Sequence, residues 1–235
     1  MDLAPSPPAL PGAQAYRERL HASSWFGALG TPLQDALIGM AVVRRLGGDD
    51  VLFPSDGLYC VVEGAIRIGA TSAEGRESLL AVLEPVNWFG EIGVLDRQAR
   101  THDARADDGA LLLHMPQAPL VALLDSAPAS LRAFALLLTH KLRLAFTVLE
   151  ETALLPTAER VARRLLLMAD GYGDLRLGTR RVLRVPQEQL ALLLALSRQT
   201  VNQVLKDFEA RGLLRLAYGE IELLDFAGLR ALARG

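Results

Sequence analysis

Cysteine is almost absent from the sequence, which has one Cys in 235 residues. A single Cys excludes a disulfide scaffold and a Cys-based zinc or iron–sulfur site. Long apolar runs are also missing, because the longest, residues 190–196, is far shorter than the roughly 18 residues of a membrane span. Residues 1–15 have neither a basic head nor an unbroken apolar stretch, so they predict a Pro-rich disordered tail and not a signal peptide. We expect a cytoplasmic protein without a membrane partner.

Motifs of catalytic and metal sites are lacking as well. The sequence has no nucleophile elbow and no phosphate-binding Gly-rich loop of the P-loop type, and its four His show no metal-ligand spacing. No catalytic residue and no metal site are therefore predicted, and an enzyme is not expected.

An excess of positive charge is missing from the chain as a whole, whose net charge is -2. The charge is unevenly distributed, however. Residues 1–156 hold 12 Lys+Arg and 18 Asp+Glu, a net charge of -6, whereas residues 157–235 hold 13 and 9, a net charge of +4. Such asymmetry is typical of an acidic module joined to one that meets an anionic partner, although ordinary domains show it too.

What the sequence does contain is a large apolar fraction, 51%, beside 22% charged residues, which indicates a folded globular protein. Helical patterns cover residues 16–30 and 32–40. Over residues 42–115, short apolar runs alternate with turn segments such as GGDD, AEGR and DDG. Short strands without long helices between them predict an antiparallel sandwich or barrel.

A long helix is predicted next, over residues 128–155. Its apolar side chains recur at spacings of three and four: Leu131, Phe134, Leu138, Leu142, Ala145 and Leu149. This stripe belongs either to an ordinary core helix or to a dimer seam. Thr157 is then expected to cap a further helix. The pattern after this helix predicts two β-type runs around a Gly-Thr turn, two short helices, a hairpin around Tyr218-Gly219 and a terminal helix.

The segment VPQEQLALLLALSRQTVNQVLKDFEARGLLRL has the pattern of a helix-turn-helix. Ser197 is a good N-cap for its second helix, which buries one side through Val201, Leu205 and Phe208. The exposed face near that N-terminus then carries polar side chains: Arg198, Gln199, Asn202 and Gln203. Arg can bridge guanine O6 and N7, and Gln or Asn can bridge adenine N6 and N7, so this helix is predicted to read the major groove.

The run SRQTVNQVLKDFEARGLL resembles the winged helix-turn-helix of the cyclic-AMP receptor protein/FNR (CRP/FNR) superfamily, and the resemblance extends over residues 25–226. It implies an α+β fold with three parts. These are an N-terminal antiparallel β jelly roll of the cyclic-nucleotide-binding type (residues 16–127), a dimerisation helix (128–156) and a C-terminal winged helix-turn-helix domain (157–235). It also implies a homodimeric transcription regulator that binds double-stranded DNA and works with RNA polymerase.

Arg198 matches the guanine-reading Arg of this family, whereas Gln199 and Gln203 stand where Glu and Arg are usual. The operator is therefore expected to differ from the prototype, and Ala195 replaces a common turn Gly. The DNA contacts that the resemblance implies are Ser197, Arg198, Gln199, Thr200, Asn202, Gln203 and Lys206, with Arg184 and Arg215 as further phosphate contacts.

The run FGEIGVLDRQARTHDA resembles the phosphate-binding cassette of the same family. Glu91 would accept a hydrogen bond from a ribose hydroxyl, and the backbone amides of Gly90 and Glu91 would face an anion. Arg100 and Thr101 would hold a cyclic phosphate. A cyclic nucleotide, cAMP or cGMP, is then the effector, and no other cofactor is expected.

Several departures leave the effector open. The family's base-contacting Thr-Ser pair aligns with Ala145-Phe146, which cannot hydrogen-bond an adenine, so Phe146 and the adjacent Thr147 are the remaining candidate ligand contacts. Val86 also replaces a Gly that is common before the cassette. The alternatives are a regulator with a vestigial sensor, in which Glu91 pairs internally with Arg100, and a cyclic-nucleotide-binding regulatory subunit that acts through a protein partner.

Overall fold

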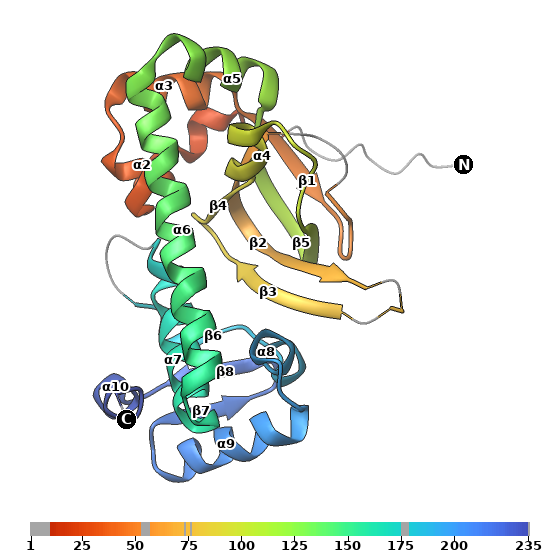
Figure 1. Cartoon of the computed structure of the whole chain (residues 1–235), viewed down its shortest axis with the longest axis vertical. Coiled ribbons are helices and arrows are strands. Elements are labelled where there is room, and N and C mark those ends of the chain that lie inside the picture. The colour runs from red at the N-terminus through yellow and green to blue at the C-terminus, as the bar shows by residue number, and fades with distance from the viewer. Residues whose placement is uncertain (1–9, 53–56, 73, 76, 175–178, 235) are drawn as a thin grey trace, which may run out of the picture.

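The structure is a computed structural model, and it describes residues 10–52, 57–72, 74–75, 77–174 and 179–234. A β domain with flanking helices, a long helix and a mainly helical C-terminal domain follow one another along the chain (Figure 1). The β domain contains η1 (Ala13–Tyr16), α1 (Arg17–Leu20), α2 (Ser24–Ala28), α3 (Thr31–Met40), β1 (Val42–Leu46), β2 (Gly57–Thr71), β3 (Glu77–Leu83), β4 (Trp88–Phe89), α4 (Glu91–Asp96), β5 (Asp103–Pro116) and α5 (Gln117–Ser126). The remaining elements are α6 (Pro128–Leu154), α7 (Thr157–Ala169), η2 (Gly171–Gly173), β6 (Val182–Leu183), α8 (Gln187–Leu194), α9 (Arg198–Ala210), β7 (Leu214–Ala217), β8 (Glu220–Leu223) and α10 (Phe226–Leu232).

The sheet of the β domain has the strand order β1-β5-β2-β3, with β4 paired to β2, and every pairing is antiparallel. The first part of strand β2, residues 57–62, is buried on both faces. Its Cys60 and Val62 pack with the N-terminal helices, whereas Tyr59 and Val61 pack with the opposite face. This alternation follows from the two-residue period of a strand, and it explains why the run LYCVV is apolar throughout.

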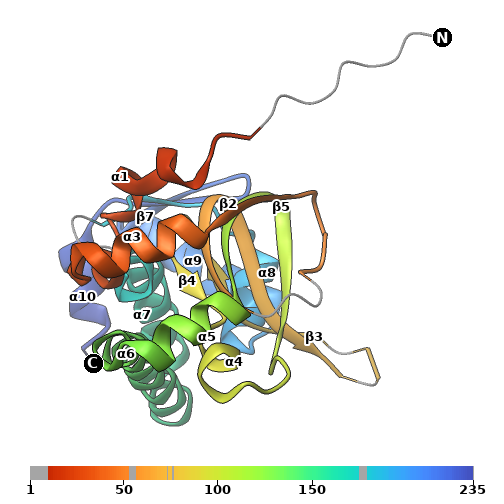
Figure 2. The same cartoon turned by 90° about the horizontal axis from the view of Figure 1, so that it is seen from above.

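The N-terminal half of α6 is packed against α2, α3 and α5, which gather at one end of the molecule (Figure 1), and the view from above shows α5 leading into α6 (Figure 2). Phe134 meets the ring of Trp25 edge-on at 5.4 Å, and Trp25 Nε1 donates a hydrogen bond to Ala133 O at 2.8 Å. The C-terminal half of α6 has no such cover, and Leu142 and Leu149 are 51% and 63% exposed. Of the two alternatives left open for the stripe, Phe134 therefore fits the core helix, whereas Leu142 and Leu149 remain exposed.

The C-terminal domain combines α7–α10 with the three-stranded sheet β6-β8-β7. Its buried cluster includes Val161 of α7 and Val201 of α9, together with Leu79 and Val82 of β3. The domain therefore packs against the outer strand of the β domain, and α9 lies at the far end of the molecule (Figure 1).

Most of the predicted elements are confirmed, including the antiparallel β domain, the long helix, the helix-turn-helix and the hairpin at Tyr218-Gly219. Thr157 does not cap α7: the N-cap position is Pro156, and no side chain makes a capping hydrogen bond there. Residues 1–9 of the predicted tail and most of the first β-type run after α7 lie outside the described residues. Helical structure begins at Ala13, inside the segment predicted to be a tail.

Among the described residues, no single helix is long and apolar enough to cross a membrane. Helices α5 and α6 meet that criterion only as a pair, which is bent by 118°.

Candidate ligand cavity and DNA interface

The cassette, residues 89–102, begins with a turn that only glycine fits. Gly90 has φ +98°, and a Cβ placed there would lie 2.3 Å from the carbonyl oxygen of Gly57. Glycine adopts this left-handed conformation without steric cost. The turn allows Glu91 to begin the short helix α4 with its side chain only 3% exposed.

Glu91 forms an ion pair with Lys141 of α6, at 2.7 Å between Oε2 and Nζ. The same ammonium group donates to the backbone oxygen of Trp88 at 2.6 Å. The sequence-based alternative paired Glu91 with Arg100, but the ion-pair partner that the structure shows for Glu91 is Lys141. Because Lys141 lies on the long helix, this contact joins the cassette to α6.

Arg100, Thr101 and His102 follow α4 on the other side of the cassette. The guanidinium carbon of Arg100 lies 5.1 Å from the centre of the Tyr59 ring, an attractive contact of a cation with an aromatic face. Thr101 Oγ1 lies 2.9 Å from His102 Nδ1. An anion that reached this edge would meet a cation and two hydrogen-bonding side chains.

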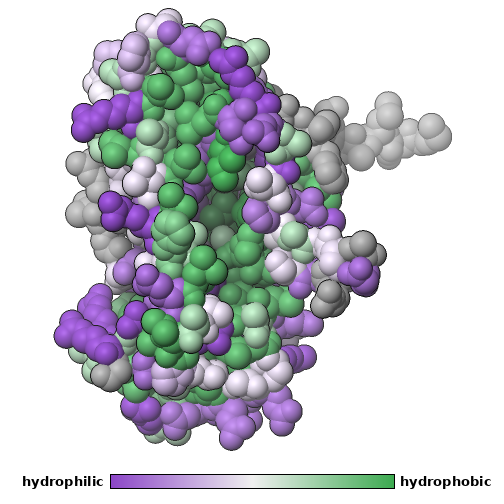
Figure 3. Space-filling view, viewed as in Figure 1, coloured by the Kyte–Doolittle hydropathy of each residue, from purple (hydrophilic) through white to green (hydrophobic). Residues whose placement is uncertain are grey.

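A cavity of about 500 Å³ lies between the cassette, α6 and α7, within the roughly 300–1,000 Å³ range of small-molecule sites. Four of the predicted ligand contacts line it: Gly90, Glu91, Arg100 and Thr101. Most of its other walls are apolar, and Figure 3 shows apolar side chains gathered along α6 and beside the hollow.

Phe146 and Thr147 are not among the residues that line this cavity, and their role as ligand contacts stays a prediction. The residues of α6 that do line its lower part are Leu144, Ala145, Val148 and Leu149. Leu144 and Val148 are four positions apart and share one face of the helix, whereas Phe146 is rotated to the other side and is 57% exposed. The Thr147 hydroxyl donates a hydrogen bond to the carbonyl oxygen of Arg143.

The far end of the cavity is made by the C-terminal domain, through Arg164, Leu167, Tyr172 and Asp174. Arg164 is 5% exposed, and its Nε has no hydrogen-bond partner within the described part of the chain. Burial lowers the pKa of Arg164 and raises the pKa of the Tyr172 hydroxyl, because each charged form loses its hydration there. None of these four residues was predicted from the sequence to belong to a site.

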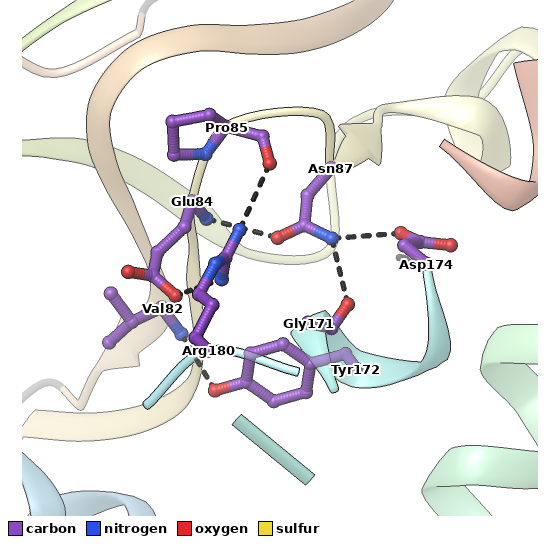
Figure 4. A network of polar contacts seen from close by, with 8 residues as sticks. All are labelled: Val82, Glu84, Pro85, Asn87, Gly171, Tyr172, Asp174 and Arg180. Carbon is purple, nitrogen blue, oxygen red and sulfur yellow. Dashed lines mark hydrogen bonds and ion pairs between the residues drawn. The ribbon is translucent and has the colours of Figure 1, made fainter. Parts of the chain in front are cut away.

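A polar network joins the two domains beside the cavity (Figure 4). Asn87 of the β domain donates to Gly171 O at 3.1 Å and to Asp174 Oδ2 at 2.9 Å. The backbone N–H of Val82 donates to the Tyr172 hydroxyl at 3.4 Å. Burial raises the pKa of Asp174, and the hydrogen bond from Asn87 opposes that change.

The same network includes an ion pair between Arg180 and Glu84, and Arg180 also donates to the carbonyl of Pro85 at 3.2 Å. Burial raises the pKa of Glu84 even though Arg180 is beside it. Farther along the interface, Gln189 of α8 donates to Asp107 of β5 at 2.8 Å. Since Asn87, Tyr172 and Asp174 also line the cavity, any ligand in it would touch the contact between the domains.

The predicted DNA-reading residues lie on and before α9. Ser197 is its N-cap, and Ser197 Oγ accepts a hydrogen bond from Thr200 N at 3.0 Å. The exposed members of the predicted set are Ser197, Arg198, Gln199, Thr200, Gln203 and Lys206. Asn202 is half-buried, and its amide donates to Gln187 of α8 at 2.7 Å, so in this structure it ties the two helices together.

Ala195 forms the turn between these helices with φ +52° and ψ +43°, the left-handed conformation that a glycine would adopt more easily. Of the expected phosphate contacts, Arg184 is paired with Glu220 at 3.1 Å and Arg215 with Glu222 at 3.1 Å. Both ion pairs are at the surface beside the hairpin. Each Arg would have to leave its Glu, or bind Glu and phosphate together, in order to contact DNA.

Comparison with known proteins agrees with this architecture. The family model described as "cyclic nucleotide-binding domain" matches residues 53–127, and the model described as "Crp-like helix-turn-helix domain" matches residues 159–232. A CRP-like cAMP-activated global transcriptional regulator from Mycobacterium tuberculosis is 31% identical over 182 residues, which cover 77% of this chain and 81% of that protein. The chain belongs to the CRP/FNR family.

Two relatives from Thermus thermophilus support the CRP/FNR assignment. A cyclic AMP receptor protein is 32% identical, over 82% of this chain and 88% of its own length. The crystal structure of a CRP/FNR transcriptional regulator superposes with a TM-score of 0.64 at 28% identity, over 83% of this chain and 99% of that one. The protein is thus a CRP-like transcriptional regulator with a domain of the cyclic nucleotide-binding family, which is the β domain, and a Crp-like helix-turn-helix domain, which is the C-terminal domain; they are called the sensor and the DNA-binding domain below.

Proposed function

We propose that this CRP/FNR protein is a homodimeric, sequence-specific DNA-binding regulator whose DNA affinity is set by an anionic small molecule in the cavity. The observation that carries the proposal is the composition of the cavity wall, in which the cassette, α6 and the first helix of the DNA-binding domain meet. We divide the chain as the sequence suggests, into sensor (residues 16–127), dimer helix (128–156) and DNA-binding domain (157–235).

The unpartnered face of α6 supports a dimer of two such helices. The apolar residues on that face are Leu131, Leu138, Leu142, Ala145 and Leu149. They are spaced by seven, four, three and four residues, which is the a/d repeat of a coiled coil. A two-fold axis along α6 would also place two α9 helices in one assembly, as a pseudo-palindromic site with half-sites about one helical turn apart requires. RNA polymerase is the further partner that the family implies.

On DNA, Arg198 would read a guanine, and Gln199 and Gln203 would contact neighbouring bases. Ser197, Thr200 and Lys206 would contact phosphates, and Asn202 would keep α9 in place on α8. Ligand control would pass through the network of Figure 4, since a molecule that moves Asn87 or Tyr172 changes how the DNA-binding domain sits on the sensor.

A cyclic nucleotide fits one end of the cavity better than the other. Arg100, Thr101 and the turn at Gly90 suit a cyclic phosphate, and relatives are named for cAMP. The walls where a base would lie are formed by Leu144, Val148 and other apolar side chains that offer no side-chain hydrogen bond.

Titration of the pure protein with cAMP and cGMP, followed by its melting temperature, tests this effector. A shift supports control by a cyclic nucleotide, and no shift at millimolar concentration favours another ligand or a vestigial sensor.

DNA reading is tested by selection from a random pool of duplexes, followed by binding of single-base variants of the selected site. Arg198→Ala is expected to lose about 1–3 kcal/mol of discrimination at one base position. Arg211→Ala is the matched control, because Arg211 is an exposed Arg just after the other end of α9. If Arg198→Ala keeps the wild-type sequence preference, α9 does not read DNA as proposed. Failure to select any sequence would instead favour a regulatory subunit that acts through a protein partner.

A further inference from the structure

Arg164 is a buried cation that forms no ion pair with another described residue, although the charge of Glu151 favours its charged form from a greater distance. It is 5% exposed, and no hydrogen bond or ion pair of its guanidinium is found within the described residues. The nearby acidic and phenolic groups are engaged elsewhere: Glu151 pairs with Arg163 at 3.3 Å, and the Tyr172 hydroxyl accepts from Val82 N. Burying an uncompensated charge is costly, and proteins normally pair such a group with a counter-ion.

Arg164 and the cassette lie at different ends of the cavity. Arg164 lies on α7, at the DNA-binding end of the cavity, whereas the cassette with Arg100 lies at the sensor side. Between them the wall is formed mainly by apolar side chains, among them Leu80, Leu83, Leu144, Val148 and Leu167. The other polar groups at this end are the Tyr172 hydroxyl and the Asp174 carboxyl, which hydrogen-bond to Val82 N and Asn87, so a ligand would meet one cation and a mainly apolar surface.

We infer that Arg164 is an anion subsite of the cavity, and that it binds the carboxylate of a mainly apolar organic acid whose body packs between α6 and α7. This inference rests on the proposed ligand control and names the class of ligand. A planar guanidinium binds a carboxylate through two parallel hydrogen bonds, and the apolar walls accept an aliphatic or aromatic body. Such a ligand contacts the DNA-binding domain directly, beside the network that holds it on the sensor.

The experiment uses the full chain with two simple acids as probes, octanoate and 4-phenylbutyrate, each compared with its neutral amide. Melting temperature and calorimetric titration are measured for the wild type, Arg164→Met and Arg164→Lys. We expect both acids, and neither amide, to raise the melting temperature of the wild type. In Arg164→Met the affinity for the acids falls roughly 10-fold to 100-fold, because a charge-assisted contact is lost.

Arg163→Met is the matched control, since Arg163 neighbours Arg164 on α7 but pairs with Glu151 and does not line the cavity. It should keep the affinity for the acids. Arg164→Lys keeps a positive charge and should bind the acids more weakly than wild type but better than Arg164→Met, which also covers the case in which the Met variant does not fold. Acids that leave the wild type unchanged, or that bind wild type and Arg164→Met equally, overturn the inference.

The outcomes also separate this inference from the proposed function. If cAMP shifts the melting temperature of wild type and Arg164→Met equally while the acids shift neither, the acid subsite is wrong and control by a cyclic nucleotide stands. If the acids bind as expected but no DNA sequence is selected, the subsite stands and the proposed regulation of DNA binding is wrong.

Discussion

Replacement of Ala195 by glycine should stabilise the helix-turn-helix. Ala195 has φ +52° and ψ +43°, and a left-handed conformation costs an L-residue roughly 1–2 kcal/mol. Glycine avoids this cost but loses more backbone entropy on folding, by roughly 0.5–1 kcal/mol. The Ala195 side chain is exposed, so little packing is lost. The expected net gain is about 0.5–1 kcal/mol, or a rise in melting temperature of roughly 1–4 °C for a chain of this size.

The assay is thermal and urea denaturation of wild type and Ala195→Gly under the same conditions. Ala231→Gly is the matched control, because Ala231 is exposed and lies in the helix α10 of the same domain, where glycine should cost about 0.5–1 kcal/mol. Opposite signs for the two substitutions are the expected result. If Ala195→Gly destabilises the protein as Ala231→Gly does, backbone strain at the turn is not the controlling term and the reasoning is refuted.

Two further predictions concern the domain contact and the dimer. Because burial raises the pKa of Asp174, the protein should lose stability as the pH rises from the ordinary Asp pKa through the raised one. Asp174→Asn should therefore be more stable than wild type at pH 7 but not at pH 4. Denaturation of both proteins across that pH range measures the difference in stability, and a difference that does not change with pH contradicts the prediction. Leu142→Glu should weaken dimerisation by about 2–3 kcal/mol, since two half-exposed leucines are lost per dimer. Arg143→Glu, one position away from the proposed dimer seam, should leave dimerisation unchanged. Analytical ultracentrifugation measures the dimerisation constant of each variant, and equal effects would place the seam elsewhere.

The fold could be predicted from the sequence where local chemistry decides it. The α9 helix begins after Ser197 because the serine hydroxyl satisfies the backbone N–H of Thr200, and this cap is visible in the sequence. The burial of Leu205 and Phe208 follows from helical periodicity in the same way. Periodicity left the neighbours of Phe134 undecided, because the stripe alone does not say which apolar residues contact the chain's own core and which contact a partner.

The candidate site was only partly predictable, because its walls come from distant segments. Gly90 and Glu91 were found from the cassette run, but Lys141, the partner of Glu91, is 50 residues away on α6. Arg164 had one overlooked signal. It lies three residues after Val161 and four before Met168, so helical spacing places a charged residue on the buried face of α7. A charge on an apolar face marks a core position that needs a partner.

The contact between the sensor and DNA-binding domains includes, beside its apolar cluster, ionisable groups whose charged forms are destabilised by burial. Burial raises the pKa of both Glu84 and Asp174, although Arg180 and Asn87 bind them, and Arg164 Nε is buried without a hydrogen-bond partner among the described residues. Replacing such groups by apolar ones would give a tighter and more permanent contact. A contact weakened by such buried groups can instead be shifted by the differential binding of the ligand anion proposed above. A regulator needs a domain contact of that marginal kind, because a ligand can only move an equilibrium by its own difference in affinity for the two states.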